Sequence, residues 1–227
     1  GNAWIAMTMS QAYYPLFADV KNRRCVVVGG GLVAQRKVTT LLRFGAKVTV
    51  VSPEATNRLA AYARQGTITL ITRRFRPGDV RGAWLVYAAT DDPRINELVS
   101  RAATRQRVFT NVVDQQPLCS FIAPSIAKRG NVVIAVSTGG ASPTLAKLLR
   151  RDLERLISND YATMLRLLER LRAVAKQRLP SYSDRKRYFA QLVRGRVFQL
   201  VRRGQTRAAR QEALRLLQAA SNGSRWS

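Results

Sequence analysis

The glycine-rich run that begins at Gly29 constrains this chain more than any other segment. Four apolar residues at 25–28 come directly before it, and such a run is typical of a buried parallel strand. A helical pattern follows over 34–44, and a second apolar strand is predicted over Lys47–Val51. The chain must therefore turn tightly between a strand and a helix, in the order of a βαβ unit.

The small residues of this turn predict a dinucleotide site. Gly29, Gly31 and Ala34 fit the spacing G-x-G-x-x-G/A, in which glycines allow a close backbone approach and the helix N-terminus holds a pyrophosphate. A tight βα turn without a ligand is the alternative interpretation. The complete order of strand, turn, helix and strand favours the dinucleotide.

The ribose end of this site is less regular. An acidic residue normally ends the second strand, whereas Ser52 stands there and Glu54 follows two residues later. Glu54 is the candidate substitute. The choice between NAD and NADP therefore stays open, and a preference for NADP would point to Arg58 or a neighbouring cation.

Strands and helices alternate through the first half of the chain. This alternation predicts an α/β fold with a Rossmann-like, doubly wound parallel sheet over residues 1–113. Asp92 followed by Pro93 is typical of a helix start. The further expected elements are helices at 56–65 and 94–105 and strands at 68–71, 84–88 and 108–113.

The pattern changes after residue 113. Two short strands at 121–124 and 132–137, followed by a helix that begins at Ser142 and Pro143, predict a small α+β dimerisation domain over 114–150. The edges of such short strands need a partner, and a second chain can supply it, so we expect a homodimer. Residues 151–227 follow a helical pattern and form the expected helical C-terminal domain.

Charge and composition restrict the chemistry. The chain has 39 basic and 13 acidic residues and no histidine. The missing histidine excludes Ser-His-Asp triads, Cys-His pairs and histidine-based zinc sites, and no metal site is expected. The net charge of +26 either attracts a polyanion or reflects base composition acting on solvated arginine-rich helices.

The sequence has no pattern typical of a membrane span, of secretion or of a disulfide-rich protein. No apolar run reaches the roughly 18 residues that a membrane span needs, and the N-terminus has no signal-peptide pattern. Cys25 and Cys119 are the only cysteines. We therefore expect a cytoplasmic protein with reduced thiols and no membrane partner.

Candidate chemical groups follow the later strands. Asp114 ends the strand at 108–113, at the edge where ligands of open α/β sheets bind, and it is the best candidate general base. Its alternative role is a cap of the following turn. Thr90 and Asp91 end another strand at the same edge, where a helix cap is the favoured interpretation. The turn at 137–142, which contains Thr138, either holds an anionic group on its backbone N–H groups or is only flexible.

Several segments together resemble the siroheme synthase family, which comprises precorrin-2 dehydrogenases, some of them also sirohydrochlorin ferrochelatases. The resemblance covers about residues 13–157 segment by segment and the helical tail more loosely. The segments that carry it are Tyr14-Pro15-Leu16-Phe17, the run 26–37, Ala89-Thr90-Asp91-Asp92, Thr110-Asn111-Val112-Val113-Asp114, Phe121-Ile122-Ala123-Pro124-Ser125 and Ser137-Thr138-Gly139-Gly140-Ala141-Ser142-Pro143.

The resemblance implies an activity and a set of roles. NAD⁺ would take a hydride from precorrin-2, a polycarboxylate tetrapyrrole, and Fe²⁺ would be a second substrate if sirohydrochlorin is also metallated. Asp114 would be the essential acid. The implied cofactor contacts are Leu32, Val33, Pro53 and Glu54, and the implied substrate contacts are Asn111 and Thr138, with Gly139 and Gly140 beside them. Because the chain stops at Ser227, the C-terminal methyltransferase of fused siroheme synthases is expected to be absent.

Two other functions remain on the sequence alone. One is a Rossmann-type regulatory or nucleic-acid-binding protein that uses the nucleotide as a ligand, supported by the basic helical tail. That tail has neither a helix-turn-helix signature nor an aromatic stacking platform, so nucleic acid is not an expected partner. The other is a chelatase that has lost its dehydrogenase activity, which the intact glycine turn argues against.

Overall fold

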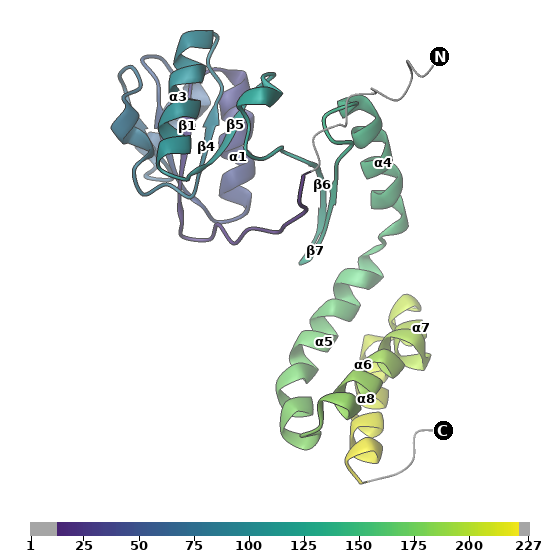
Figure 1. Ribbon diagram of the computed structural model, residues 1–227. Helices are drawn as coiled ribbons and strands as arrows, with labels where there is room; N and C mark the ends of the chain where they lie inside the picture. Colours follow the sequence, from purple (N-terminus) through teal and green to yellow (C-terminus); the bar gives the residue numbers. More distant parts are fainter. Residues whose placement is uncertain (1–12, 223–227) are drawn as a thin grey trace, which may run out of the picture. The chain divides into compact units, whose positions relative to one another are not determined.

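The computed structural model describes residues 13–222, which form two compact units (Figure 1). Of the described residues, the first unit comprises 13–123 together with Gly139–Ala141. The second unit comprises Pro124–Thr138 and residues 142–222. The domain boundaries that we expect at 114 and 151 stay predictions.

The first unit is built on a five-stranded parallel sheet. Its strands lie in the order β3-β2-β1-β4-β5, so the chain begins in the middle and winds outward in both directions. This arrangement confirms the predicted doubly wound sheet. The strands are β1 (Arg24–Val28), β2 (Lys47–Val51), β3 (Thr69–Ile71), β4 (Leu85–Ala88) and β5 (Phe109–Val112), and the helices are α1 (Leu32–Arg43), α2 (Asn57–Arg64) and α3 (Pro93–Arg105).

The position of β1 in the middle of the sheet explains why residues 25–28 are all apolar. Val26 and Val28 pack into the core on the α3 side of the sheet, whereas Cys25 and Val27 pack into the core on the α1 and α2 side. All four side chains are at most 2% exposed. Because successive side chains of a strand point to opposite faces, a strand covered on both faces must be apolar throughout.

Two helices begin as the sequence predicts. The Asp92 carboxylate accepts a hydrogen bond from the Arg94 N–H at 2.9 Å, and Pro93 is the first residue of α3. In the second unit the Ser142 hydroxyl accepts a hydrogen bond from the Leu145 N–H at 3.1 Å and so caps α4 (Pro143–Leu156). Each cap satisfies a backbone donor that the first helical turn leaves without a partner.

The second unit begins with a hairpin of β6 (Ser125–Arg129) and β7 (Val132–Val136), against which α4 packs. The expected strand at 121–124 is wrong, because β6 begins only after the expected strand ends, with Ser125 opposite Val136. Phe121 belongs to the first unit, where its ring lies 5.4 Å from that of Tyr87. Pro124 has no N–H to give to a strand ladder.

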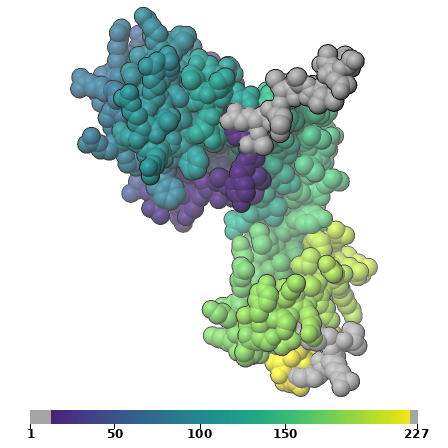
Figure 2. Space-filling view, in the orientation of Figure 1, coloured from purple at the N-terminus to yellow at the C-terminus, as the bar shows by residue number. Residues whose placement is uncertain are grey.

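The rest of the second unit is helical, as expected, with α5 (Asn159–Arg178), α6 (Tyr182–Arg194), α7 (Arg196–Arg202) and α8 (Thr206–Ser221). These helices share one apolar core and gather into one body, green to yellow in Figure 2. At its centre Tyr188 is completely buried, and its hydroxyl donates to the Ala213 carbonyl at 2.9 Å. Within residues 13–222 no helix has the length and apolarity to cross a membrane.

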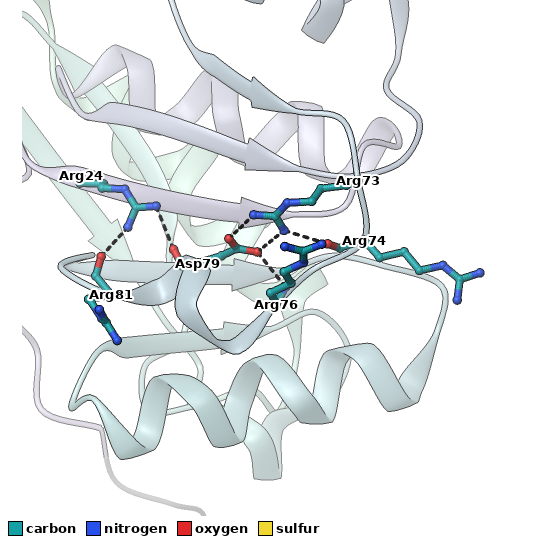
Figure 3. Close-up of polar contacts among 6 residues, drawn as sticks. All are labelled: Arg24, Arg73, Arg74, Arg76, Asp79 and Arg81. Carbon is teal, nitrogen blue, oxygen red and sulfur yellow. Dashed lines mark hydrogen bonds and ion pairs between the residues drawn. The ribbon is translucent and has the colours of Figure 1, made fainter.

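An ion pair between half-buried Arg73 and buried Asp79 fixes the loop between β3 and β4, which contains the short 3₁₀ helix η1 (Pro77–Val80) (Figure 3). Both guanidinium N–H ends of Arg73 donate to the Asp79 carboxylate, at 2.7 and 2.8 Å, and the Arg76 N–H donates to the same group at 2.8 Å. Arg24, at the start of β1, donates to the backbone carbonyls of Asp79 and Arg81. The loop is therefore tied both to itself and to the central strand.

Replacing Asp79 by Asn should lower the free energy of unfolding by about 1–3 kcal/mol, because it breaks a bidentate pair and leaves the Arg73 donors poorly matched. The Arg73 hydrogen bonds lower the pKa of Asp79 in the folded protein. The stabilisation is thus complete above the unfolded pKa of about 3.9 and is lost as the pH falls through the lower folded pKa.

Urea titrations at pH 7 and at the lowest pH where the protein stays folded measure this dependence. The deficit of the variant should be large at pH 7 and should shrink in acid. Asp91→Asn, at an exposed position, is the control and should cost little at either pH. An equal deficit of Asp79→Asn at both pH values would contradict the assignment.

Candidate functional site

A cavity of about 790 Å³ lies at the carboxyl ends of the parallel strands in the first unit. Residues that follow β1, β2, β3 and β4 all contribute to its wall, as expected where ligands bind to open α/β sheets. The lining residues are Val28, Gly29, Gly30, Gly31, Leu32, Val33, Val51, Ser52, Pro53, Glu54, Ala55, Thr56, Arg74, Phe75, Ala89, Thr90, Asp91, Asp92, Arg94 and Ile95.

The three glycines of the turn have three different roles. Gly29 has φ +118°, and a Cβ there would lie 2.2 Å from the Ala89 carbonyl oxygen. A Cβ on Gly30 would lie 1.8 Å from the carbonyl oxygen of Glu54, a close approach that the sequence pattern did not assign. Gly31 has an ordinary φ of −79°, and a Cβ there would meet nothing within 4 Å. Gly29 and Gly30 are thus required by the fold, whereas Gly31 leaves space in the cavity.

The N-terminus of α1 faces this space. Gly31 caps the helix without a side-chain hydrogen bond, and the first turn contains no acidic residue. The first backbone N–H groups of the helix are therefore available to an anion, and the helix dipole favours one. Leu32 and Val33 line the cavity, and their contact with a cofactor stays a prediction, whereas Ala34 is fully buried and packs the helix against the sheet. These features fit a dinucleotide pyrophosphate.

The expected ribose end lies in the wall formed after β2 and β3. Ser52 is 8% exposed, and its N–H donates to the Ile71 carbonyl at 3.1 Å. Pro53 and Glu54 line the cavity with exposed side chains. Arg58 does not line it, because its guanidinium donates to the Tyr62 hydroxyl at 3.0 Å. The cation that does line this wall is Arg74.

Thr90 and Asp91 also line the cavity, after β4. The buried Asn96 side chain holds this corner by accepting from the Thr90 hydroxyl at 2.8 Å and donating to the Thr90 carbonyl at 2.9 Å. The helix cap expected as the main role of Thr90 and Asp91 belongs to the next residue, Asp92. The Asp91 carboxylate is left exposed at the cavity wall.

Asp114 lies in the turn after β5, in the left-handed region with φ +59°, and its side chain is exposed. It does not line the dinucleotide cavity. Its electrostatic neighbour is Lys37 of α1, which the sequence reasoning missed. Burial lowers the pKa of Lys37, with a further contribution from Arg36, and the charges of Asp114 and Cys119 oppose this. The Lys37 ammonium also lies 4.9 Å from the Tyr87 ring centre. The burial of Lys37 could have been predicted from its position three residues after Ala34, because residues with this spacing lie on the same face of a helix.

Asn111 is not brought to the cavity. Its side chain is 8% exposed, and its amide N–H₂ donates to the Phe121 carbonyl at 3.0 Å. The structure thus gives Asn111 a place in the fold, and its contact with a substrate stays a prediction.

The glycine pair at 139–140 is attached to the first unit. Gln116, in the 3₁₀ turn η2 (Gln116–Leu118), donates to the Gly139 carbonyl at 3.2 Å. Gly140 has φ +90°, and a Cβ there would lie 2.5 Å from the Gln116 amide oxygen. Gly139 and Gly140 therefore lie beside a residue two positions after Asp114. Thr138 belongs to the second unit, where its hydroxyl donates to the Ser142 carbonyl at 3.0 Å and accepts from the Ser142 N–H at 3.1 Å.

The cysteines are unlike reactive thiols. Both Cys25 and Cys119 are buried and free. Burial raises the pKa of Cys25 to about 11 and also raises the pKa of Cys119. Both therefore stay protonated at neutral pH. Within the described part of the chain, no three His, Cys, Asp or Glu residues are grouped so that they could hold a metal ion.

The fold and the cavity define a dinucleotide-binding protein of the Rossmann class with an added helical unit. Three sequence models of known families match consecutive parts of this chain. A putative NAD(P)-binding family matches residues 16–125, the central region of sirohaem biosynthesis proteins matches 129–156, and the sirohaem synthase dimerisation region matches 160–217. The chain belongs to the siroheme synthase family.

Individual relatives agree with this assignment. The siroheme synthase of Actinobacillus succinogenes is 42% identical over 200 residues, which cover 88% of this chain and 42% of the relative. Siroheme synthase 1 of Serratia proteamaculans is 41% identical over 212 residues, which cover 93% and 44%. The chain thus spans less than half the length of these relatives. The solved structure of SirC, a precorrin-2 dehydrogenase, has the same fold, with a TM-score of 0.74, 24% identity and coverage of 91% of this chain and 99% of that one.

Replacing Gly31 by Leu should abolish dinucleotide binding and leave the fold intact. The new side chain would extend into the cavity at the helix N-terminus, while the φ of −79° suits any residue. The loss of unfolding free energy should stay within about 1 kcal/mol. Gly30→Ala is the comparison variant. Because its Cβ would clash with the Glu54 carbonyl oxygen, it should lower the free energy of unfolding by about 1–3 kcal/mol or more.

Titration calorimetry with NAD⁺ and thermal unfolding of both variants measure the two effects. Wild-type affinity in a folded Gly31→Leu protein would show that the dinucleotide does not lie over this turn.

Proposed function

We propose that this protein oxidises precorrin-2 to sirohydrochlorin with NAD⁺ as the acceptor. The observation that carries the proposal is the cavity with an open helix N-terminus, in a chain that belongs to the siroheme synthase family. The family membership also disfavours the regulatory and nucleic-acid-binding alternative. The name of the structural neighbour, precorrin-2 dehydrogenase, agrees with the proposed reaction.

The reaction removes two electrons and two protons from the tetrapyrrole. NAD⁺ supplies the hydride acceptor when it is bound, so one proton and both electrons leave together. The backbone N–H groups at the start of α1 hold the pyrophosphate, and Gly31 leaves the room for it. The second proton must go to a base of the protein or to water.

Asp114 is the proposed base. It follows β5 at the same sheet edge as the cavity, and its exposed carboxylate can accept a proton. Lys37 of α1 is its electrostatic neighbour, since the charge of Asp114 opposes the lowering of the Lys37 pKa by burial. The left-handed backbone of Asp114 is uncommon for a residue other than glycine, and such conformations cluster at functional sites.

The substrate is a polycarboxylate, so cations and backbone N–H groups are the proposed means of holding it. Thr138, Gly139 and Gly140 provide the backbone turn that we propose as an anion contact, and Asn111 remains a proposed contact from the resemblance. Siroheme is the iron chelate of sirohydrochlorin, and the curated relatives are named siroheme synthases. This name favours Fe²⁺ as a second substrate of the same protein.

Replacing Asp114 by Asn should lower the rate of precorrin-2 oxidation by about 10²–10⁴-fold and leave NAD⁺ binding unchanged. The amide keeps the shape of the side chain but cannot accept the proton at neutral pH. Single-turnover absorbance measurements follow sirohydrochlorin formation, and calorimetry follows NAD⁺. Asp184→Asn, at a half-buried site in the first turn of α6, is the control and should be as active as the wild type.

A folded Asp114→Asn protein that oxidises precorrin-2 at nearly the wild-type rate would refute the base assignment. Repeating the assay with Fe²⁺ separates the two steps, because retained oxidation with lost metal insertion would restrict Asp114 to the second.

We also propose that the protein is a homodimer. The match to the sirohaem synthase dimerisation region covers residues 160–217, whereas the sequence reasoning expected the contacts at 114–150. Helix α4 overlaps the expected segment and leaves a row of leucines exposed. These are Leu145, Leu149, Leu153 and Leu156, which are 47%, 41%, 37% and 72% exposed. Their spacing of four, four and three residues places them on one helix face, where a partner chain would cover them.

Replacing both Leu149 and Leu153 by Glu should convert a dimer at micromolar concentration into a monomer. Each buried leucine contributes about 1.5–3 kcal/mol and would occur twice in a two-fold interface. Multi-angle light scattering measures the mass. Lys147→Glu, on the opposite face of the same helix, should stay dimeric. A monomeric wild-type protein would refute the dimer, and a dimeric double variant would place the interface elsewhere.

A further inference from the structure

Arg74 is an arginine at the cavity wall whose side chain has no partner in the described part of the chain. Its guanidinium makes no hydrogen bond or ion pair with residues 13–222, and Figure 3 shows it extended away from the Arg73–Asp79 pair. Arg58, which the sequence suggested for this end, and Arg94, which also lines the cavity, both have partners. Arg58 donates to Tyr62, and Arg94 contacts the Asp92 carboxylate at 3.5 Å.

The backbone brings Arg74 to the same corner as Ser52. Strands β2 and β3 are neighbours, with Val51 opposite Ile71. The Ile71 carbonyl accepts from the Ser52 N–H at 3.1 Å and from the Arg73 N–H at 3.0 Å. One oxygen atom thus fixes the end of β2 and the turn that leads to Arg74.

The ion pair of Arg73 then holds Arg74 in place. The guanidinium of Arg73 binds Asp79 and also donates to the Arg74 carbonyl at 2.9 Å. Arg73 is therefore used by the fold, whereas the next residue has a fixed backbone and a free cationic side chain. A guanidinium with five N–H donors, carried on a fixed backbone, is suited to a phosphate group.

The end of β2 is where the adenosine ribose of a bound dinucleotide lies in this fold. An acid at that position accepts from the ribose 2′-hydroxyl and repels a 2′-phosphate, whereas a nearby arginine accommodates the phosphate. Here the position holds Ser52, whose hydroxyl makes no hydrogen bond with the described residues. Glu54 lies two residues later, exposed, at the same wall.

We propose that Arg74 and Ser52 form a subsite for a phosphate monoester on the adenosine ribose, so that the cavity takes NADP⁺ as well as NAD⁺. Arg74 binds the 2′-phosphate of NADP⁺, and Glu54 accepts from the 2′-hydroxyl of NAD⁺. The inference rests on the dinucleotide site of the proposed function and adds to it a second cofactor and the residues that select it.

Binding alone tests the subsite. Calorimetry on the full chain compares NAD⁺ with NADP⁺, and adenosine 5′-monophosphate with adenosine 2′,5′-bisphosphate, which differ only in the 2′-phosphate. Arg74→Ala should lower the affinity for NADP⁺ and for the bisphosphate by about 10-fold or more, and that for NAD⁺ by less than about 2-fold. Raising the salt concentration should weaken NADP⁺ binding to the wild type more than to this variant.

Two matched variants complete the experiment. Arg58→Ala removes a nearby arginine that does not line the cavity and should leave the affinities for both cofactors unchanged. Glu54→Gln should weaken NAD⁺ and leave NADP⁺ unchanged or tighter, because it removes the acceptor for the hydroxyl and a negative charge near the phosphate.

The outcomes separate this inference from the proposed function. NAD⁺ binding without measurable NADP⁺ binding would overturn the subsite and leave the dinucleotide site standing. An equal loss of both cofactors in Arg74→Ala would also overturn it, because Arg74 would then contact the shared pyrophosphate. Binding of neither cofactor to the wild type would refute the proposed function and the subsite with it.

Discussion

The close backbone contacts at the end of β1 are the constraint on which the rest of the first unit depends. Because Gly29 and Gly30 have no Cβ, the turn can lie against the carbonyls of Ala89 and Glu54. The Gly30 carbonyl accepts from the Thr56 N–H at 2.9 Å, which ties the same turn to the start of α2. Three segments are thereby held around the N-terminus of α1. A side chain at either glycine would push them apart and would open the cavity wall.

Because of this arrangement, the cavity can bind an anion although the turn at 29–31 contains no lysine or arginine. Backbone N–H groups at the start of α1 supply the positive potential, and the sheet holds them in place. The cations are placed one strand further out, where the Arg73–Asp79 pair fixes the loop that carries Arg74. Of these two adjacent arginines, Arg73 stabilises the loop, and Arg74 is the one that we propose to bind the ligand.

The sequence predicted most of the first unit because its signals are local. The buried β1 run, the glycine turn and the Asp92-Pro93 start of α3 each depend on neighbouring residues, and the structure confirms them. The strand expected at 121–124 was wrong because the burial of Phe121 depends on Tyr87 and Phe109, which are distant in sequence. The positions of Lys37 beside Asp114 and of Arg74 at the ribose corner were missed for the same reason. Each follows from the packing of separate strands and helices, which no local pattern contains.

The use of the carboxylates gives an independent argument for the site. With 39 basic residues and 13 acidic ones, almost every carboxylate can find a partner. Within residues 13–222 the structure gives nine of the acids a hydrogen bond or an ion pair, as in the Asp79 clamp and the Asp92 cap. The four without one are Glu54, Asp91, Asp114 and Asp184. Asp184 lies in the first turn of α6, where the helix dipole stabilises it. The other three all follow strands of the parallel sheet, at its carboxyl edge. In a chain without histidine, Glu54, Asp91 and Asp114 are therefore the carboxylates at this edge that stay available to a ligand or to a proton.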